Sequence, residues 1–153
     1  AYEMREAVLE HYKDCSVIIK TAAVADFRCR AENCQKIKKQ EDQDILLLEL
    51  EKNPDIIGEL GRIKEDRILV GFAAETEKLV DHAYDKLKRK KLDLIIANDV
   101  SKPGIGFGSD KNEVTIIDKT GYARHVPEKS KDEIADVILD AVKRLLKKKK
   151  KER

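Results

Sequence analysis

Along the chain, stretches of almost continuous apolar residues alternate with stretches whose apolar residues recur every three or four positions. A run such as "LDLIIAN" (92–98) is typical of a strand buried on both faces of a sheet. The spacing of Leu79, Val80, Ala83 and Leu87 is instead typical of one face of an α-helix. The pattern predicts strands over 16–25, 44–50, 67–75, 92–98 and 113–118, helices over 2–13 and 53–63, a helix capped by Thr76, and a helix that begins with a capping box of Ser130 and Glu133.

This alternation of helices with buried strands predicts an α/β fold, in which a mostly parallel sheet has helices on both faces. No internal repeat and no linker divides the chain, so its 153 residues are expected to form one domain. The chain begins with a helix, whereas doubly wound domains begin with a strand and a glycine-rich phosphate loop. We therefore expect the sequence to open in the middle of a fold.

Composition excludes several classes of protein. The chain is 41% apolar and 41% charged, and no apolar run approaches the 18 residues of a membrane span. The N-terminus does not resemble a secretory signal. Cys15, Cys29 and Cys34 are odd in number and lack the spacing of metal ligands, so we expect reduced thiols in a cytoplasmic protein.

The positive charge is concentrated at the C-terminus. Residues 143–153 hold eight basic residues and one acid, a charge of +7, so the rest of the chain, +2 overall, carries −5. Such a basic tail can contact nucleic acid or a membrane surface. A solvated helix end, whose cations suit the C-terminal dipole, is the more frequent explanation, and nucleic acid is an unlikely partner.

Three predicted strands end on residues that could carry chemistry. Asp26 follows the strand over 16–25, Glu75 ends "GFAAE" (71–75) shortly after Phe72, and "AND" (97–99) supplies Asn98 and Asp99. Because the carboxyl ends of parallel strands meet at one edge of a sheet, these residues should border one crevice.

Cations could face the same crevice. Lys36, Lys38 and Lys39 lie in a predicted loop, and Lys86 and Lys90 lie four residues apart on a helix, where both can reach one phosphate chain. The helix over 53–63, with Asn53 as N-cap and Pro54 at its first position, offers free N–H groups to an anion.

Each of these features also has an ordinary structural explanation. Asp26 can cap a turn, Phe72 can be a core residue, and the lysines can be solvated. His11, His82 and His125 have no evident partner, and "GIGFG" (104–108) follows Pro103 rather than a strand. The residues alone therefore indicate an anion- or nucleotide-binding α/β domain.

Six motifs, in order, resemble one known family. "AAVADFR", "KIKK", "NPDII", "VGFAAET", "LDLIIANDV" and "GFGSDKNEV" are similar to segments of the phosphopantothenoylcysteine synthetase (phosphopantothenate–cysteine ligase) family. The resemblance covers residues 1–146 as a ligase domain and leaves 147–153 as a basic tail. It implies a Rossmann-like fold, a homodimer, and Mg²⁺ or Mn²⁺. Because the apolar run "DILLLEL" (44–50) lies beside a long polar stretch, we expect this run or the loop before it to contribute to the dimer interface.

The resemblance also implies a reaction. 4'-Phosphopantothenate attacks the α-phosphate of CTP, which gives an acyl-cytidylate and pyrophosphate, and the amine of L-cysteine then displaces CMP. A carboxylate is a poor electrophile until it is activated, and phosphoryl transfer depends on cations and positioning.

Carried over position by position, the resemblance implies roles for particular residues. Lys36 matches the mobile lysine of the family, Ala23 matches a position tied to turnover of the intermediate, and Asn98 is a candidate for substrate binding. The nucleotide-binding positions are Lys20, Thr21, Ala22, Asp26, Lys36, Pro54, Asp55, Ile56, Ile57, Phe72, Lys86 and Lys90.

The chain departs from the family at its start. The "GGT" turn and the "SSG" segment of the family have no counterpart here, so the ligase domain is expected to be incomplete at its N-terminus. A flavoprotein decarboxylase half can be fused upstream in bacterial members. The alternative hypotheses are a nucleotide-binding fragment without catalytic activity of its own and a nucleic-acid protein that depends on the lysine tail.

Overall fold

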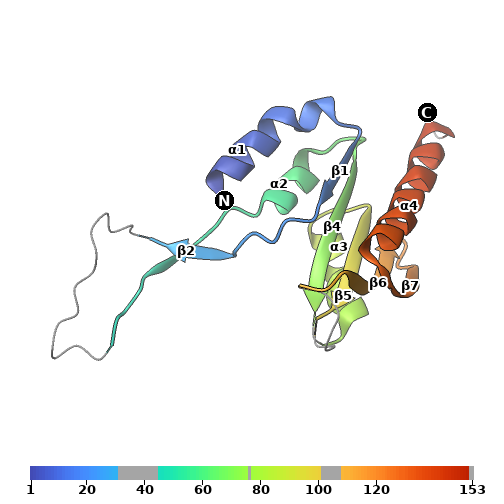
Figure 1. Ribbon diagram of the computed structural model, residues 1–153. Helices are drawn as coiled ribbons and strands as arrows, with labels where there is room; N and C mark the ends of the chain where they lie inside the picture. The colour runs from blue at the N-terminus through green and yellow to red at the C-terminus, as the bar shows by residue number, and fades with distance from the viewer. Residues whose placement is uncertain (31–44, 76, 101–107, 152–153) are drawn as a thin grey trace.

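The computed structural model describes residues 1–30, 45–75, 77–100 and 108–151, in which four α-helices and seven strands are assigned. Helices and strands alternate along most of this length, as the hydrophobic pattern predicts (Figure 1). The elements are α1 (Tyr2–His11), a 3-10 turn (Tyr12–Asp14), β1 (Val17–Lys20), β2 (Phe27–Cys29), β3 (Leu50–Lys52), α2 (Ile56–Ile63), β4 (Ile68–Glu75), α3 (Leu79–Arg89), β5 (Leu94–Asp99), β6 (Lys111–Asp118), β7 (Ala123–Ser130) and α4 (Lys131–Lys151).

Five of these strands form one mixed sheet in the order β1-β4-β5-β6-β7. β1, β4 and β5 are parallel, with Ile19 beside Val70 and Phe72 beside Ile96. β6 and β7 run antiparallel to their neighbours, so the expectation of a mostly parallel sheet is wrong for this half. The α/β class itself is confirmed, and the three parallel strands are those whose carboxyl ends matter for the site.

β7 was missed by the sequence pattern because it is an edge strand with a single fully buried side chain, Val126. Its other residues are exposed or half-buried. It also includes Pro127, which an edge strand tolerates because its outer side pairs with no other strand of this sheet. Asp118 and Gly121 form the tight connection from β6 to β7: Gly121 has a φ of +88°, and its N–H donates to the carbonyl of Asp118 at 3.0 Å.

Two other expected strands are shorter or displaced. The strand expected over 16–25 ends at Lys20, and residues 21–26 continue as irregular backbone. Of the stretch expected over 44–50, residue 44 lies outside the described residues, and among 45–50 only Leu50 belongs to a strand. Residues 45–48 are exposed irregular chain. A continuous apolar run therefore indicated burial here where the chain has none.

Helices cover both faces of the sheet, as predicted. On one face Leu69, Ile95 and Ile117 pack against Leu60 of α2 and Leu87 of α3, with α1 beside them; we call this the α2–α3 face. On the other, the α4 face, alternate residues of the same strands pack against Ile134, Ile138 and Val142 of α4. Because side chains alternate along a strand, the face of each site residue follows from its position.

Two glycines let α2 approach its neighbours closely. A Cβ at Gly61 would lie 1.9 Å from the carbonyl oxygen of Lys90, and a Cβ at Gly71 would lie 2.8 Å from Ile57 Cδ1. α2 therefore packs with its backbone against the end of α3 and with Ile57 against β4. This contact determines where Lys90 lies relative to the beginning of α2.

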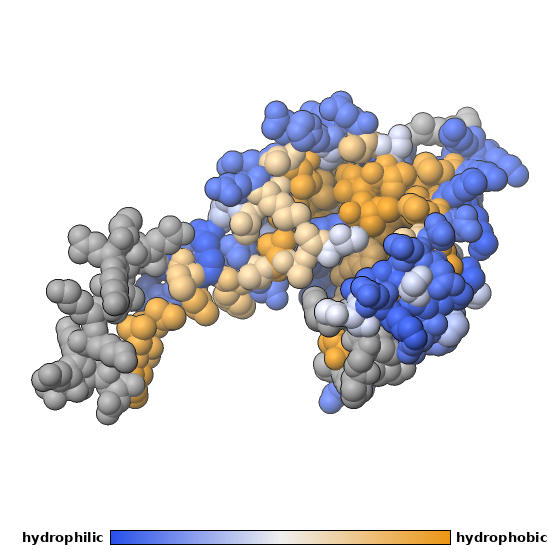
Figure 2. Space-filling model, in the orientation of Figure 1, coloured by the Kyte–Doolittle hydropathy of each residue, from blue (hydrophilic) through white to orange (hydrophobic). Residues whose placement is uncertain are grey.

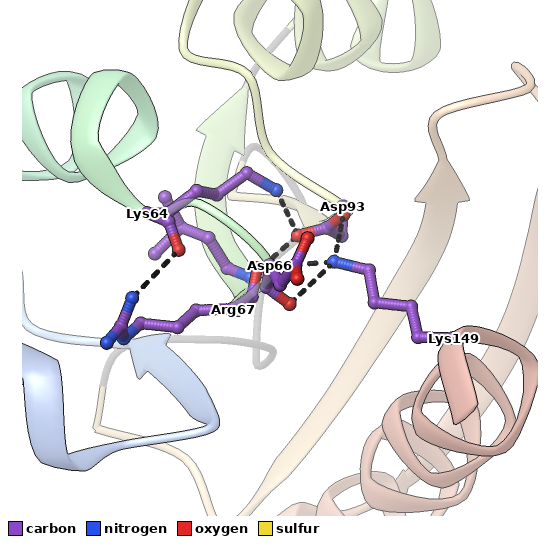
Figure 3. A network of polar contacts seen from close by, with 6 residues as sticks. Lys64, Asp66, Arg67, Asp93 and Lys149 are labelled. Atoms are coloured by element: carbon purple, nitrogen blue, oxygen red, sulfur yellow. Dashed lines mark hydrogen bonds and ion pairs between the residues drawn. The ribbon is translucent and has the colours of Figure 1, made fainter. Parts of the chain in front are cut away.

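At the amino ends of the parallel strands, the buried carboxylate of Asp93, directly before β5, connects this strand to α2 and α4 (Figure 3). Asp93 is 4% exposed, accepts a hydrogen bond from the Leu69 N–H at 2.8 Å, and pairs with Lys64. Lys149 of α4 reaches the same carboxylate at 3.5 Å and donates to the carbonyls of Asp66 and Arg67 at 3.1 and 3.3 Å.

The basic end of the chain is therefore not uniformly solvated. α4 continues to Lys151, and Lys147, Lys148 and Lys150 are exposed, as expected of a helix end. Lys149 contradicts that expectation because it binds a buried acid. Among the described helices, none is both long enough and apolar enough to cross a membrane.

β2 and β3 form a separate two-stranded antiparallel ribbon that projects from the body of the molecule (Figure 1). Arg28 pairs with Glu51 across the ribbon and stacks over the ring of Tyr2 at 4.2 Å, which ties β2 to α1. Beyond this anchor the side chains of residues 45–48 are all more than half exposed, and Figure 2 shows apolar residues along the projection.

Removing the Asp93 carboxylate should destabilise the fold strongly. Asp93→Ala leaves the Lys64 ammonium, 13% exposed, without its carboxylate and the Leu69 N–H without an acceptor, so we expect a loss of about 3–5 kcal/mol in the free energy of unfolding. Lys149→Ala should cost about 1–2 kcal/mol through its lost charged hydrogen bonds.

Urea denaturation followed by circular dichroism measures both effects. Lys148→Ala, at the position directly before Lys149 in α4, is the matched control. It should change the free energy of unfolding by less than about 0.5 kcal/mol because Lys148 is exposed. Equal stabilities of Lys149→Ala and Lys148→Ala would show that the Lys149 contact contributes nothing.

Candidate functional site

A cleft of about 570 Å³ opens at the carboxyl ends of β1, β4 and β5. The prediction that these three strand ends border one crevice is confirmed for Asp26, Phe72 and Asn98, because the strands are parallel neighbours. Glu75 and Asp99, which were expected there too, are not among the residues that line it. The residues that line the cleft are Lys20, Thr21, Ala22, Ala23, Val24, Ala25, Asp26, Asn53, Pro54, Asp55, Ile56, Ile57, Phe72, Ala73, Ala74, Lys90, Asn98, Gly108, Asn112 and Lys131.

The half of the cleft on the α2–α3 face holds a cluster of charges. Lys20 lies two residues after Ile18, which packs against the core of the α2–α3 face, so both residues lie on that face. The Lys20 ammonium donates to the carbonyl of Ala22 at 3.0 Å. Lys90, at the end of α3, donates to Asp55 Oδ1 at 2.9 Å. Two cations and a carboxylate thus line one side of the cleft, all of them among the expected nucleotide-binding residues.

The beginning of α2 differs from the expectation. α2 begins at Ile56, and its N-cap is Asp55 rather than Asn53, so Pro54 precedes the helix. Asp55 Oδ1 accepts the Gly58 N–H at 3.1 Å, and the Pro54 carbonyl accepts the Ile56 N–H at 3.1 Å. The chain itself therefore occupies N–H groups that were expected to be free for an anion.

Asn53 instead joins the two walls of the cleft. Its Nδ2 donates to the carbonyl of Ala25 at 2.8 Å, and its backbone N–H donates to the carbonyl of Asp26 at 2.8 Å. These bonds hold the irregular segment after β1 against the segment before α2. Asp26 is exposed on this wall.

The charges of this half perturb one another. Burial, and after it the neighbouring charge of Lys90, lowers the pKa of the Lys20 ammonium, which Asp55 and Asp26 only partly offset. Burial acts to raise the pKa of the Asp55 carboxyl, but the hydrogen bonds from Lys90 and the Gly58 N–H outweigh it, so this pKa lies below its ordinary value. A bound anion would relieve the repulsion between the two lysines.

Among the described residues that were expected to bind nucleotide, Lys86 is the one that does not line the cleft. Its ammonium pairs with Glu75 at 2.5 Å, and the Glu75 side chain is 12% exposed. His82 Nδ1 lies 3.7 Å from the same carboxylate, and His125 Nε2 lies 3.8 Å from Glu113, so both histidines have an acidic neighbour that the sequence did not reveal. Lys86 and Lys90 are four residues apart, but the ammonium of Lys86 pairs with Glu75 and that of Lys90 pairs with Asp55.

The other half of the cleft lies on the α4 face. Phe72 lies two residues after Val70, and Asn98 lies two residues after Ile96, so each lies on the same face of the sheet as that residue. Val70 and Ile96 both belong to the core under α4. Phe72 is 38% exposed, so it is a surface of the cleft rather than a core residue.

Asn112 and Lys131 complete this half, and sequence reasoning missed both. β6 brings Asn112 to the cleft beside a register shift between Asn112 and Val114. Lys131 is the first residue of α4. The quoted motif "GFGSDKNEV" contains Asn112, but only the folded sheet shows that it faces the same cleft.

Several expectations concern chemistry that the described residues test only in part. Lys36, Lys38 and Lys39 lie outside the described residues, as does Cys34. Ala23 lines the cleft, and with a methyl side chain it can act only through its backbone and its small size. Cys15 and Cys29 are free. The described residues contain no group of three potential metal ligands.

Comparison with known proteins gives consistent matches. The family model for the DNA/pantothenate metabolism flavoprotein C-terminal domain matches residues 1–146. The coenzyme A biosynthesis bifunctional protein CoaBC of Bacillus subtilis (strain 168) is 48% identical over 147 residues, which are 96% of this chain and 36% of that protein. A cysteine/cysteine sulfinic acid decarboxylase of an unknown prokaryotic organism is 41% identical over 140 residues, 91% of this chain and 38% of that protein.

A solved structure has the same fold. The crystal structure of the C-terminal domain of coenzyme A biosynthesis bifunctional protein CoaBC superposes with a TM-score of 0.76 at 35% identity, over 97% of this chain and 63% of that one. The chain spans little more than a third of the length of the two curated relatives above. The activity in a relative's name therefore belongs to a protein much longer than the shared part.

Anion binding in the cleft should weaken as pH rises, and earlier than for an ordinary lysine site. An anion binds the charged form of Lys20, and the lowered pKa means that this form is lost below the pH at which a free lysine deprotonates. Calorimetric titration with inorganic pyrophosphate from about pH 7 to 10 measures the effect. Lys20→Arg should keep its affinity to higher pH because a guanidinium stays charged. Identical pH profiles for the two proteins would contradict a role of Lys20 in the anion site.

Proposed function

The chain belongs to the family of DNA/pantothenate metabolism flavoprotein C-terminal domains, and we propose that it carries the phosphopantothenate–cysteine ligase reaction. In this proposal 4'-phosphopantothenate, CTP and L-cysteine yield 4'-phosphopantothenoylcysteine, CMP and pyrophosphate. The observation that carries the proposal is the cleft at the parallel strand ends, which unites nearly all the described residues expected to bind nucleotide. The similarity to bifunctional CoaBC supports the choice of reaction.

The first half-reaction needs positive charge where pyrophosphate leaves. The carboxylate of phosphopantothenate attacks the α-phosphate, the bond to the bridging oxygen breaks, and pyrophosphate departs with the charge of that bond. Lys20 and Lys90 supply this charge from the α2–α3 face. Asp55 holds Lys90 in place before the nucleotide arrives, so little reorganisation is needed at the moment of reaction.

The second half-reaction needs an uncharged amine near the activated carbonyl. The cysteine nitrogen attacks the acyl carbon, CMP leaves, and the amine gives up its proton as the amide forms. Ala22, Ala23, Ala73 and Ala74 line the cleft with methyl groups, which leaves room for the acyl group and allows close approach to the backbone. These alanines position the intermediate, and a larger side chain there would displace it.

Magnesium or manganese fits this site as a partner of the nucleotide. Mg²⁺ is usually held by one or two carboxylates together with substrate phosphates, and Asp26 offers an exposed carboxylate on the cleft wall. When bound, the ion would neutralise phosphate charge. We also propose a Rossmann-like classification, which the parallel β1-β4-β5 arrangement supports, and a cytoplasmic location, which the free cysteines support.

The proposed function is tested by following both products. The complete gene product should release pyrophosphate from CTP only with phosphopantothenate present, and CMP only when L-cysteine is added. Binding of CTP without release of either product would favour the alternative, a nucleotide-binding module without ligase activity. Absence of CTP binding would contradict both.

Two lysine substitutions should separate the cleft from the Glu75 pair. Lys90→Ala removes a charged contact of the cleft, so the free energy of CTP binding should weaken by about 1.5–3 kcal/mol, or roughly 10–150-fold in affinity. Lys86→Ala should weaken CTP binding much less, because Lys86 pairs with Glu75 outside the cleft. Isothermal titration with CTP measures both dissociation constants.

The control addresses the carboxylate that Lys90→Ala leaves behind. Asp55 would lose its partner and repel the phosphates, so the double variant Lys90→Ala/Asp55→Asn should recover part of the affinity. Equal losses in Lys86→Ala and Lys90→Ala would show that Lys86 leaves Glu75 for the nucleotide.

We further propose that the chain forms a homodimer through the β2–β3 ribbon and the apolar strip over 45–48. Residues 45–48 are four consecutive aliphatic residues, and Ile45 and Leu47 are 72% and 88% exposed. Contact of so much apolar surface with water is unfavourable in free energy. A two-stranded ribbon is also marginally stable by itself. A second copy would cover the apolar side chains of both ribbons.

A double substitution in the strip should dissociate this dimer. Leu46→Asp/Leu48→Asp places two charges where the proposal buries apolar side chains, so sedimentation velocity should show monomers where the unaltered protein sediments as a dimer. Leu139→Asp, an exposed leucine of α4, is the control and should leave the dimer intact. A monomeric unaltered protein at micromolar concentrations would exclude the dimer.

A further inference from the structure

A second cavity, of about 340 Å³, lies at the amino ends of the parallel strands, at the opposite end of the sheet from the cleft. Three segments form it: residues 13–16 before β1, residues 65–67 before β4, and Leu146, Lys149 and Lys150 of α4. The cavity shares no lining residue with the cleft, so the proposed ligase reaction does not use it.

Arg67 fixes two of these segments to each other. Its Nε donates to the carbonyl of Tyr12 at 3.0 Å, and its Nη2 donates to the carbonyl of Lys13 at 2.9 Å. Its Nη1 pairs with Glu65 at 2.8 Å, so the chain itself neutralises this acid of the cavity. The segment before β1 and the segment before β4 therefore hold their relative positions through their own bonds.

Lys149 fixes the third segment. Its ammonium donates to the carbonyls of Asp66 and Arg67 at 3.1 and 3.3 Å and lies 3.5 Å from the buried carboxylate of Asp93 (Figure 3). The end of α4 is thereby joined to the loop before β4. The cavity is consequently a preformed feature of the fold.

Two other lysines of the cavity keep their charges available. Lys13 and Lys150 line it and are exposed, and their ammoniums form no hydrogen bond or ion pair within the part of the chain that the structure describes. Ser16 also lines the cavity, and its exposed hydroxyl is a further donor. Two cations from different segments thus lie at one cavity without a counter-charge.

The end of α4 gives this region a positive potential. Four basic and three acidic residues line the cavity itself, so the larger charge comes from the helix beside it. Residues 143–151 hold seven basic residues and no acid, which far exceeds the roughly half negative charge of a helix C-terminus. These like charges repel one another, and an anion with several charges would relieve the repulsion.

From this arrangement we infer that the cavity is an effector site for a small anion with two or more phosphate groups. Lys13 and Lys150 bind the phosphate oxygens from two sides, and the Ser16 hydroxyl donates a third contact. A concave site of this volume accommodates a di- or triphosphate, whereas a nucleic-acid strand would lie along an open surface. Bound anion would also favour the position of Lys149 at Asp93, because it offsets the repulsion between Lys149 and the neighbouring lysines.

Calorimetric titration with inorganic pyrophosphate tests this site beside the cleft. The unaltered protein should show two binding sites. Lys13→Gln/Lys150→Gln should raise the dissociation constant of one site at least tenfold and leave the other within about twofold, and Lys20→Gln/Lys90→Gln should do the reverse. Lys143→Gln/Lys148→Gln removes the same charge from exposed positions of α4 outside the cavity, and it should change either constant less than about threefold.

A single site that is lost only in Lys20→Gln/Lys90→Gln would overturn the inference. Equal losses in Lys13→Gln/Lys150→Gln and in the control variant would overturn it as well, because they would show a diffuse effect of charge rather than a site. Neither measurement involves ligase activity, so the effector site and the proposed function can fail separately.

Cys15 gives an independent measurement because its free, exposed thiol lines the cavity. In Cys29→Ser/Cys34→Ser, bound pyrophosphate should slow the reaction of Cys15 with an uncharged maleimide at least threefold at constant ionic strength. Adding Lys13→Gln/Lys150→Gln should abolish this protection. Protection by a single-stranded oligonucleotide but not by pyrophosphate would overturn the small anion in favour of nucleic acid, and protection by neither would overturn the site.

Discussion

The close approach of α2 to the end of α3 controls the electrostatics of the cleft. At Gly61 the backbone of α2 lies so near the Lys90 carbonyl that a single methyl group would overlap it. This packing brings the end of one helix to the beginning of another, and Lys90 consequently bonds to the N-cap carboxylate Asp55. Burial is the main cause of the lowered pKa of Lys20, and the charge of Lys90, which this contact positions, lowers it further.

The hydrophobic pattern predicted the parts of the fold whose burial is uniform. β4 and β5 read as continuous apolar runs because helices cover both of their faces, and their order along the chain correctly predicted that they are parallel. β7 could not be recognised in the same way, since only Val126 is buried on it. Residues 45–48 show the opposite failure, because an apolar run does not distinguish a core strand from an exposed segment.

The candidate site was predictable where it depends on strand ends and local motifs. Asp26 and Phe72 come together in the cleft as their places at strand ends indicated, and Lys20 and Asp55 join them as the family resemblance implied. Lys131 and Asn112 were missed because their position depends on how β6 and α4 pack on the far side of the sheet, which no local spacing records. The partner of Lys86 was missed for a similar reason, since Glu75 reaches it from a strand eleven residues earlier in the chain.

The division of the cleft by the sheet edge also constrains where bonds can form. In the proposed reaction a substrate carboxylate must come within bonding distance of the α-phosphate, which is easiest near the boundary between the two halves. Ala73 belongs to the α2–α3 face, and Ala74, one residue later, belongs to the α4 face; both line the cleft. Small side chains at this boundary let ligands from the two sides approach the backbone and each other.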